Sequence, residues 1–345
     1  MTETTVTPAT GKRRATFNTL EVSELRRLTD DSVEVTFAVP EELADDYDYV
    51  PGQYVALRKE LDGAEVRRSY SICAVPKRGE IRVAVKKDIG GTFSTWANES
   101  LEVGEKIDVM NPQGAFTSRT HVTSLNDAQK VAAEKVAEKK DTHLVAFAAG
   151  SGITPIMAIA KSVLAASETA RFSLIYANRS AMDVMFAEEI GDLKDKYPAR
   201  FTVHHVLSRE QRVSPLLSGR IDEDKLTTLL DRVIDVEGTD EWFLCGPFEL
   251  VQLTRETLAA RGVSEDAVRF ELFDTSICMV GSHLSSGSNN KEERNADYHA
   301  IARDLVFTRG RTIDSHDHIF WAGDLNYRIA LPSAEDVRDL ASRRQ

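Results

Sequence analysis

Cysteine is scarce in this chain of 345 residues, which contains only Cys73, Cys245 and Cys278. Three thiols give no disulfide framework, and they favour a reducing, cytoplasmic location. Long apolar runs are also missing: no stretch approaches the roughly 18 apolar residues that span a bilayer, so no membrane insertion is predicted. Positive charge is not in excess, because the formal net charge is -12. This balance argues against a protein that coats nucleic acid or a membrane surface.

The first 123 residues predict a polar lead and a β-rich domain. Residues 1–14 have no apolar core of the kind a secretory signal needs, so we expect a disordered lead there. From 15 to 123, apolar segments are separated by turns such as the one at Pro51 and Gly52. These segments are SVEVTFAV, QYVALRK, RSYSICAV and IRVAVKK. Short strands at this spacing predict a small antiparallel barrel.

The rest of the chain changes character three times. Residues 124–142 are rich in Ala, Lys and Glu, which predicts a solvated linker helix. From 143 to 273, buried strand patterns alternate with helical ones, which predicts a doubly wound parallel sheet. The strand patterns are HLVAFAA, FSLIYAN, FTVHHVL and EWFLCG. In residues 274–345 we expect strands at TSICMVG and HIFWAGD, an amphipathic helix at KEERNADYHAIARDL, and a second helix at SAEDVRDLASRR.

Two short motifs of the first domain suit a phosphate and a planar ring. On a strand, Arg68 and Tyr70 point to one face, and Ser71 at the strand end can donate a hydrogen bond to a flavin. Glycines before a helix free backbone N–H groups for a pyrophosphate. Such glycines open the segment GGTFS, whose candidate ligands are Gly90, Gly91, Thr92 and Ser94. Either motif alone is equally typical of an ordinary strand or turn, and the combination carries the prediction.

RSYS followed by GGTFS resembles the FAD-binding motif pair of the ferredoxin–NADP reductase family. The resemblance implies that Arg68 holds the flavin diphosphate and that Tyr70 stacks on the isoalloxazine. It also implies that the glycine-led helix caps the pyrophosphate, so FAD is expected instead of FMN. The predicted fold is then an antiparallel FAD-binding β barrel followed by a doubly wound parallel NADP-binding sheet, with an incomplete α+β tail.

A second glycine turn links the strand HLVAFAA to a helix. Its strand and helix context is the one that a dinucleotide pyrophosphate requires. The candidate ligands in this turn are Gly150, Gly152, Thr154 and Pro155. Ser208 and Arg209 follow the strand FTVHHVL, and in this family such a pair grips the 2′-phosphate of NADP. Arg179 is a second candidate near the ribose and phosphates, and the alternative reading is that both arginines are ordinary surface residues.

Cys245, Gly246 and Pro247 end the strand EWFLCG. In this family the CGP turn places the cysteine beside the nicotinamide C4 and the flavin N5, while a buried structural cysteine is the alternative. Hydride transfer depends on geometry, since the cofactors do the chemistry. We therefore expect Tyr70 to stack on the flavin, Ser71 to donate a hydrogen bond to the flavin N5, and Cys245 to position the nicotinamide of NADPH.

Runs such as AGSGITPIMAIAKSVL and NRSAMDVMFAEE look most like the reductase subunits of phenylacetyl-CoA epoxidases, over roughly three quarters of the chain. That subfamily continues with a plant-type [2Fe–2S] domain, whose cluster needs four cysteines. Three cysteines cannot supply this set, and we predict no metal site. The expected partner is therefore an external electron acceptor, either an oxygenase component or a ferredoxin.

The tail resembles the middle of an inositol-polyphosphate 5-phosphatase of the synaptojanin type. In GDLNYR, Asp324 and Asn326 would match the pair that activates the attacking water. His283 would match a phosphate contact and Arg328 a substrate contact. The family's upstream glutamate and downstream Ser-Asp-His segment are not found, which favours an inactive fragment joined at an artificial or erroneous junction near Phe273. The alternatives are a Mg²⁺-dependent inositol-phosphate 5-phosphatase activity and a docking module.

Overall fold

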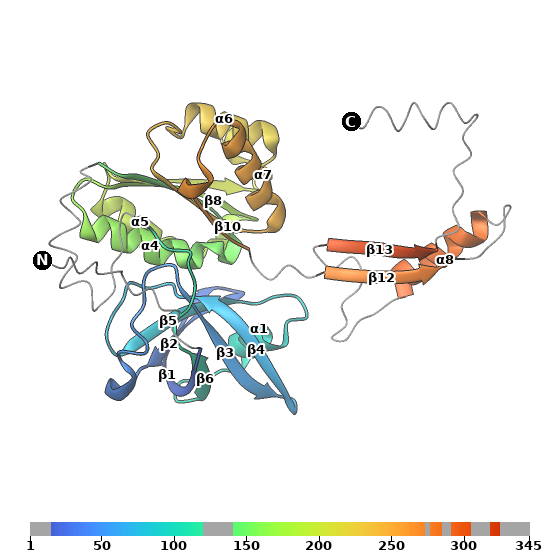
Figure 1. Cartoon of the computed structure of the whole chain (residues 1–345), viewed down its shortest axis with the longest axis horizontal. Helices are drawn as coiled ribbons and strands as arrows, with labels where there is room; N and C mark the ends of the chain where they lie inside the picture. The colour runs from blue at the N-terminus through green and yellow to red at the C-terminus, as the bar shows by residue number, and fades with distance from the viewer. Residues whose placement is uncertain (1–14, 120–140, 273–276, 285–290, 305–317, 325–345) are drawn as a thin grey trace, which may run out of the picture. The chain divides into compact units, whose positions relative to one another are not determined.

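The computed structural model describes residues 15–119, 141–272, 277–284, 291–304 and 318–324 (Figure 1). The chain divides into two compact units, residues 1–273 and 274–345. The predicted lead, almost all of the predicted linker helix, and the predicted helix SAEDVRDLASRR lie outside the described residues.

The first part of the larger unit is a six-stranded antiparallel barrel in the order β4-β3-β6-β1-β2-β5. Its strands are β1 (Phe17–Thr29), β2 (Ser32–Ala38), β3 (Tyr54–Leu61), β4 (Ala64–Ser71), β5 (Glu80–Lys86) and β6 (Lys106–Met110). Ile72, just after β4, bridges Val83 of β5 and so links the two outer strands. Helix α1 (Thr92–Glu99) packs on the barrel, with Phe93 in its core. The predicted barrel is confirmed.

The second part is a five-stranded parallel sheet in the order β11-β10-β7-β8-β9. Its strands are β7 (His143–Ala149), β8 (Arg171–Asn178), β9 (Phe201–Leu207), β10 (Glu241–Gly246) and β11 (Val268–Leu272). Helices α4 (Ile153–Ala166) and α5 (Ala187–Lys196) cover one face, while α6 (Glu223–Arg232) and α7 (Phe248–Ala260) cover the other (Figure 1). Short 3₁₀ turns are η1 (Glu41–Leu43), η2 (Gly150–Gly152), η3 (Ala181–Asp183), η4 (Pro215–Leu217) and η5 (Glu265–Ala267). The predicted doubly wound sheet is confirmed.

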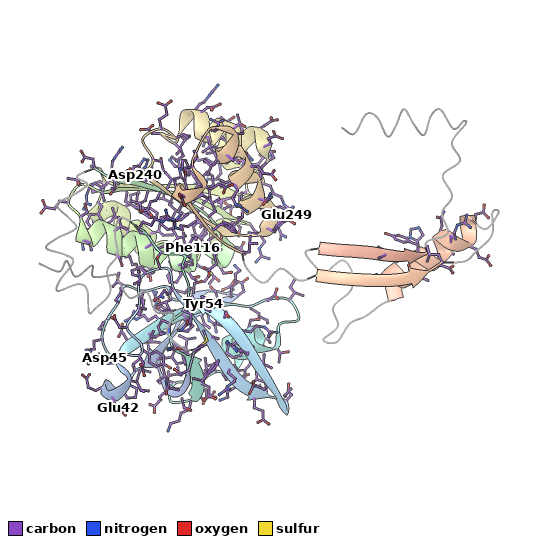
Figure 2. The ribbon with its side chains drawn as sticks, viewed as in Figure 1. Glu42, Asp45, Tyr54, Phe116, Asp240 and Glu249 are labelled. Atoms are coloured by element: carbon purple, nitrogen blue, oxygen red, sulfur yellow. The ribbon has the colours of Figure 1, made fainter. Side chains whose placement is uncertain are left out.

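The two parts of this unit share a hydrophobic core. Alternate residues of β7 and β10 face opposite sides of the sheet, so Leu144 packs with α4 and α5, and Val145 packs with α6 and α7. The first of these clusters continues into the barrel through Phe116 (Figure 2). The Phe116 ring lies edge-on to Phe243 of β10, with 5.5 Å between the ring centroids. The barrel is therefore packed against the α4 side of the sheet.

Strand β11 is an element that the sequence patterns did not predict. It reads VRFEL, with Arg269 and Glu271 alternating with apolar residues at the edge of the sheet. An edge strand of five residues gives no continuous apolar run, so the signal of a buried parallel strand is missing. β11 matters for the site because its register places Glu271 beside Cys245.

The smaller unit contains β12 (Ile277–His283), α8 (Lys291–Asp304) and β13 (His318–Asp324), and its two strands pair in parallel. The predicted strands and first helix are thus present. The amphipathic character predicted for α8 was wrong, because its few apolar residues do not gather on one side. Among all described residues, no helix is long and apolar enough to cross a membrane.

Candidate functional site

The RSYS and GGTFS motifs lie together on the barrel. Tyr70, on β4, is half-buried, and its ring centroid is 5.7 Å from that of Phe93 in α1. Arg68 lies two residues earlier, on the same face of β4. Its Nη1 donates to the Arg67 carbonyl at 2.7 Å, and no carboxylate among the described residues pairs with its guanidinium. Arg68 therefore keeps donors for an anion from outside the chain.

Two glycines precede α1 and bring the chain close to itself. A methyl group on Gly91 would clash with the Ser94 hydroxyl and would lie 3.2 Å from the Asp88 Cβ. Ser94 is buried, and its hydroxyl accepts from the Asp88 N–H at 3.0 Å, so it supports the loop from inside. Beside the start of α1 is a groove of 390 Å³. It is lined by Leu61, Asp62, Gly90, Gly91, Thr92, Thr95, Trp96, Glu99 and Ser100.

The start of α1 offers the N–H donors that a diphosphate needs, while the carboxylates of Asp62 and Glu99 also line the groove. The first N–H groups of α1 have no side-chain cap, and the N-terminal end of a helix carries partial positive charge. A groove of this size is within the usual range for small-molecule sites. Gly90, Gly91 and Thr92 thus bring backbone donors to this groove, while Arg68 is not among its lining residues and the buried Ser94 hydroxyl acts within the loop.

The second glycine turn joins β7 to α4, as the sequence predicts. Gly150 has a φ of 54°, a left-handed conformation that glycine adopts without a Cβ penalty. Thr154 is buried, and its hydroxyl donates to the Ser151 carbonyl at 3.0 Å. Gly152 caps α4, and Pro155 lies in its first turn, where a missing N–H costs nothing. The remaining N–H groups of the turn are available to a phosphate.

Ser208 and Arg209 are held beside Arg179 at the carboxyl ends of β8 and β9. The Arg209 N–H donates to the Arg179 carbonyl at 2.7 Å. The exposed Arg209 side chain has no carboxylate partner among the described residues. By contrast, the guanidinium of Arg179 donates to Asp183 at 2.7 Å and to Asp31 of the barrel at 3.2 Å. The structure thus leaves Arg209, the first candidate for the 2′-phosphate, without a carboxylate partner among the described residues, and pairs the second candidate, Arg179, with two.

A second polar contact joins the barrel to the sheet at Ser71 and Glu271. Ser71, at the end of β4, donates its hydroxyl to Glu271 Oε2 of β11 at 3.0 Å. Glu271 is paired in register with Cys245 of β10, which is completely buried. Gly246 ends β10, and Pro247 caps α7 directly after it. The strand end of the flavin motif thus lies at the same place as the CGP turn.

Burial controls the charges at this junction. It raises the pKa of the Glu271 carboxyl above its ordinary value, while the hydrogen bond from Ser71 opposes that rise. Burial also raises the pKa of the Cys245 thiol well above its ordinary value, and the Glu271 carboxylate adds to the effect. A neutral thiol cannot act as a nucleophile. The arrangement suits precise placement of bound groups and gives no covalent catalyst.

Sequence reasoning missed Glu271 because β11 itself was missed. One signal was available: the short segment VRFEL follows α7 and alternates charged with apolar residues, as an edge strand does. A half-buried carboxylic acid with a raised pKa often marks a functional site. The structure shows its partners, which lie 26 and 200 positions away in the sequence.

A barrel packed on a parallel sheet, each with a glycine turn before a helix, is the arrangement expected of an oxidoreductase with two dinucleotide-binding domains. Comparison with protein families agrees with this class. Residues 19–118 match the sequence model of the oxidoreductase FAD-binding domain, and residues 147–256 match that of the oxidoreductase NAD-binding domain.

Two curated relatives cover both domains. The chain is 40% identical over 260 residues to one subunit of the 1,2-phenylacetyl-CoA epoxidase of Escherichia coli, a match that covers 75% of this chain and 68% of the relative. It is 32% identical over 258 residues to the ferredoxin reductase component of the 3-ketosteroid-9-alpha-monooxygenase of Rhodococcus rhodochrous. That match covers 74% of this chain, and the chain spans 65% of the relative's length.

The FAD/NAD-binding domain of a nitric oxide dioxygenase from Vibrio cholerae has the same fold, with a TM-score of 0.59. The two proteins are 23% identical, and the likeness covers 74% of this chain and 98% of that structure. The chain belongs to the family of FAD- and NAD-binding oxidoreductases of the ferredoxin–NADP reductase type.

The smaller unit has a relative of another kind. The chain is 56% identical over 72 residues to a polyphosphatidylinositol phosphatase of Saccharomyces cerevisiae, a match that covers 21% of this chain and 6% of that protein. A model of the endonuclease/exonuclease/phosphatase family 2 matches residues 204–345. The backbones of His283 and Asp324 are partners in the β12–β13 register, while Asn326 and Arg328 lie outside the described residues.

Proposed function

We propose that this protein takes hydride from NADPH onto FAD and passes the electrons to an external acceptor. The observation that carries the proposal is the meeting of Ser71, Glu271 and Cys245. These residues come from the strand end of the flavin motif, from the sheet edge, and from the CGP turn. Two dinucleotides bound at the two glycine turns would bring their reactive rings to this junction.

The chain's part in the reaction is to hold, orient and exclude water. When bound, FAD supplies the redox chemistry, and the protein supplies the geometry. Arg68 and the start of α1 hold the diphosphate, and Tyr70 stacks on the ring system. The buried Cys245 thiol fills the space beside the nicotinamide without adding charge, and Ser71 is kept in one orientation by Glu271.

The preference for NADPH over NADH is assigned to Ser208 and Arg209. The extra phosphate of NADPH is a dianion near neutral pH, and a guanidinium binds it with charge-assisted hydrogen bonds. Arg209 is exposed and has no carboxylate partner among the described residues, so it can take this phosphate without breaking an ion pair. Arg179 would first have to leave Asp31 and Asp183, so we give it the lesser share.

The acceptor is a separate protein, an oxygenase component or a ferredoxin. The two curated relatives are named as part of an epoxidase and as a reductase component of a monooxygenase. Within these 345 residues there are three cysteines, and two of them, Cys73 and Cys245, are buried in different domains. A plant-type cluster needs four, so these residues cannot supply its ligands by themselves.

The test of the nucleotide assignment is the substitution Arg209→Ala. Loss of a charge-assisted contact should raise the KM for NADPH by about tenfold or more, while the KM for NADH stays within about twofold. The assay is reduction of ferricyanide by each nucleotide. Arg232→Ala is the matched control, because Arg232 is an exposed arginine of the same domain at the end of α6. Equal loss with both nucleotides would contradict the assignment.

A further inference from the structure

The hydroxyl of Tyr176 lies beneath the glycine turn between β7 and α4. Tyr176 is on β8, inside the parallel sheet, and it is completely buried. Its Oη donates a hydrogen bond of 2.9 Å to the carbonyl oxygen of Gly150, the first residue of the turn. The same carbonyl accepts from the Ile153 N–H at the start of α4. One peptide group of the turn is thus anchored to the sheet and to the helix together.

This hydrogen bond fixes the direction of a neighbouring donor. No peptide bond among the described residues is cis. In a trans peptide the C=O and the following N–H point in opposite directions. Because the Gly150 carbonyl points inward to Tyr176, the Ser151 N–H of the same peptide points outward. That is the side from which a phosphate approaches the start of a helix.

The Tyr176 ring is held so that its hydroxyl cannot drift. It belongs to the cluster that α4 and α5 cover, and its ring centroid is 5.8 Å from that of His205, its partner in the β8–β9 register. Burial raises the pKa of Tyr176 well above its ordinary value, against the effect of the Asn178 side chain and the Met185 backbone. The hydroxyl therefore stays protonated and remains a donor.

We infer that Tyr176 is a positioning residue for the nicotinamide dinucleotide. Its hydroxyl sets the orientation of the Gly150–Ser151 peptide, which aims the Ser151 N–H at the pyrophosphate. The inference rests on the proposed function, because it takes this glycine turn as the pyrophosphate site. Gly150 has no Cβ and so can adopt several backbone conformations, and the hydrogen bonds from Tyr176 and Ile153 favour the one seen here.

The test is Tyr176→Phe, which removes one oxygen atom and keeps the packing. The matched control is Tyr47→Phe: Tyr47 is buried in the barrel and donates to the Val109 carbonyl at 2.6 Å, far in sequence from either glycine turn. Both variants lose a buried hydrogen bond to a backbone carbonyl. Melting temperatures then report the structural cost, which should be similar in the two proteins.

The readout is calorimetric binding of two probes to the flavin-loaded protein. NADP⁺ carries the pyrophosphate, and adenosine 2′-monophosphate carries only the phosphate assigned to Ser208 and Arg209. We expect Tyr176→Phe to raise the Kd for NADP⁺ by about 2- to 10-fold and to leave that for adenosine 2′-monophosphate unchanged. In turnover, the KM for NADPH should rise while kcat stays within about twofold. Tyr47→Phe should change neither Kd.

Three results would overturn the inference. An NADP⁺ affinity that Tyr176→Phe leaves unchanged would show that the hydroxyl serves stability alone. Equal weakening of both probes would point to a general disturbance of the domain. If the unsubstituted protein binds no NADP⁺ at all, the proposed function fails and this inference fails with it, so the two failures are told apart.

Discussion

Glu271 is a carboxylic acid between two domains, with a serine hydroxyl from the barrel as its donor and a buried thiol beside it in the sheet. Its charge is disfavoured by burial and favoured by the hydrogen bond, and burial has the larger effect on the pKa. A negative charge at this point would act on any ring bound beside Ser71. The raised pKa of Glu271 should therefore make the properties of this site depend on pH.

Replacing this acid makes stability less dependent on pH. Because the pKa of Glu271 is raised in the folded state, the folded protein holds this proton more tightly than the unfolded chain does. Its ionisation therefore destabilises the fold as the pH rises from the ordinary value of about 4.3 through the raised one. We expect the melting temperature of Glu271→Gln, relative to the unsubstituted protein, to increase across that window. A difference that does not vary with pH would contradict the assigned shift.

The Cys245 thiol should resist alkylation in the folded protein. It is completely buried, and its raised pKa keeps it in the unreactive thiol form. After treatment with iodoacetamide at about pH 8, mass spectrometry should find the peptide containing Cys245 unmodified. The same peptide should be modified in urea. Rapid labelling without denaturant would mean that the thiol is accessible and ionised, against the positioning role proposed for it.

At the scale of elements, helix α1 depends on the close approach of its leading glycine. Gly91→Ala would force the Cβ against Ser94 and Asp88, and the N–H groups at the start of α1 would move. We expect the variant to bind FAD at least severalfold more weakly and to melt earlier. FAD content after dialysis and a thermal scan are the two measurements.

Gly191→Ala is the matched control for that substitution. Gly191 lies within α5 and has nothing within 4 Å of a Cβ placed on it. A helical glycine replaced by alanine gains about 0.5–1 kcal/mol of folding free energy, so this variant should melt slightly later and keep its FAD. If the two variants lose FAD equally, the proposed role of the start of α1 is wrong.

How far the sequence could predict these elements depends on where their contacts lie. β7, β8 and β10 are interior strands with mostly buried residues, so their apolar patterns could be predicted directly. The edge strand β9 was also predicted, from the apolar residues of FTVHHVL. The edge strand β11 is half polar and could not be predicted. Likewise the residue types of the RSYS and GGTFS motifs predicted that the two motifs act together on one barrel. The side-chain partners of Arg179 and Ser71 were not predicted. Asp31, the barrel partner of Arg179, and Glu271, the partner of Ser71, lie 148 and 200 positions away and follow from tertiary packing alone.

At the scale of the whole molecule, the reductase domains and the phosphatase-like segment fall in separate compact units. The cofactor motifs, the shared core and the Ser71–Glu271 contact all lie in residues 1–273. The smaller unit has a register that pairs the backbones of His283 and Asp324. We therefore assign the redox activity to the larger unit alone.

Removal of residues 274–345 tests this division. The shortened protein should retain its FAD, its KM for NADPH and its rate of ferricyanide reduction to within about twofold. In parallel, the full chain should release no phosphate from a 5-phosphorylated inositide in the presence of Mg²⁺. Phosphate release that disappears on Asp324→Ala would instead establish a second activity in the smaller unit.

The measurement that tests the central claim most directly is the visible absorption spectrum of the purified full chain, recorded without oxygen before and after NADPH is added. We predict flavin bands that bleach on addition of NADPH and return when ferricyanide is added. A protein that shows no flavin bands after reconstitution with FAD would contradict the barrel site. Flavin bands that NADPH leaves unchanged would contradict the meeting of the two cofactors at Ser71, Glu271 and Cys245.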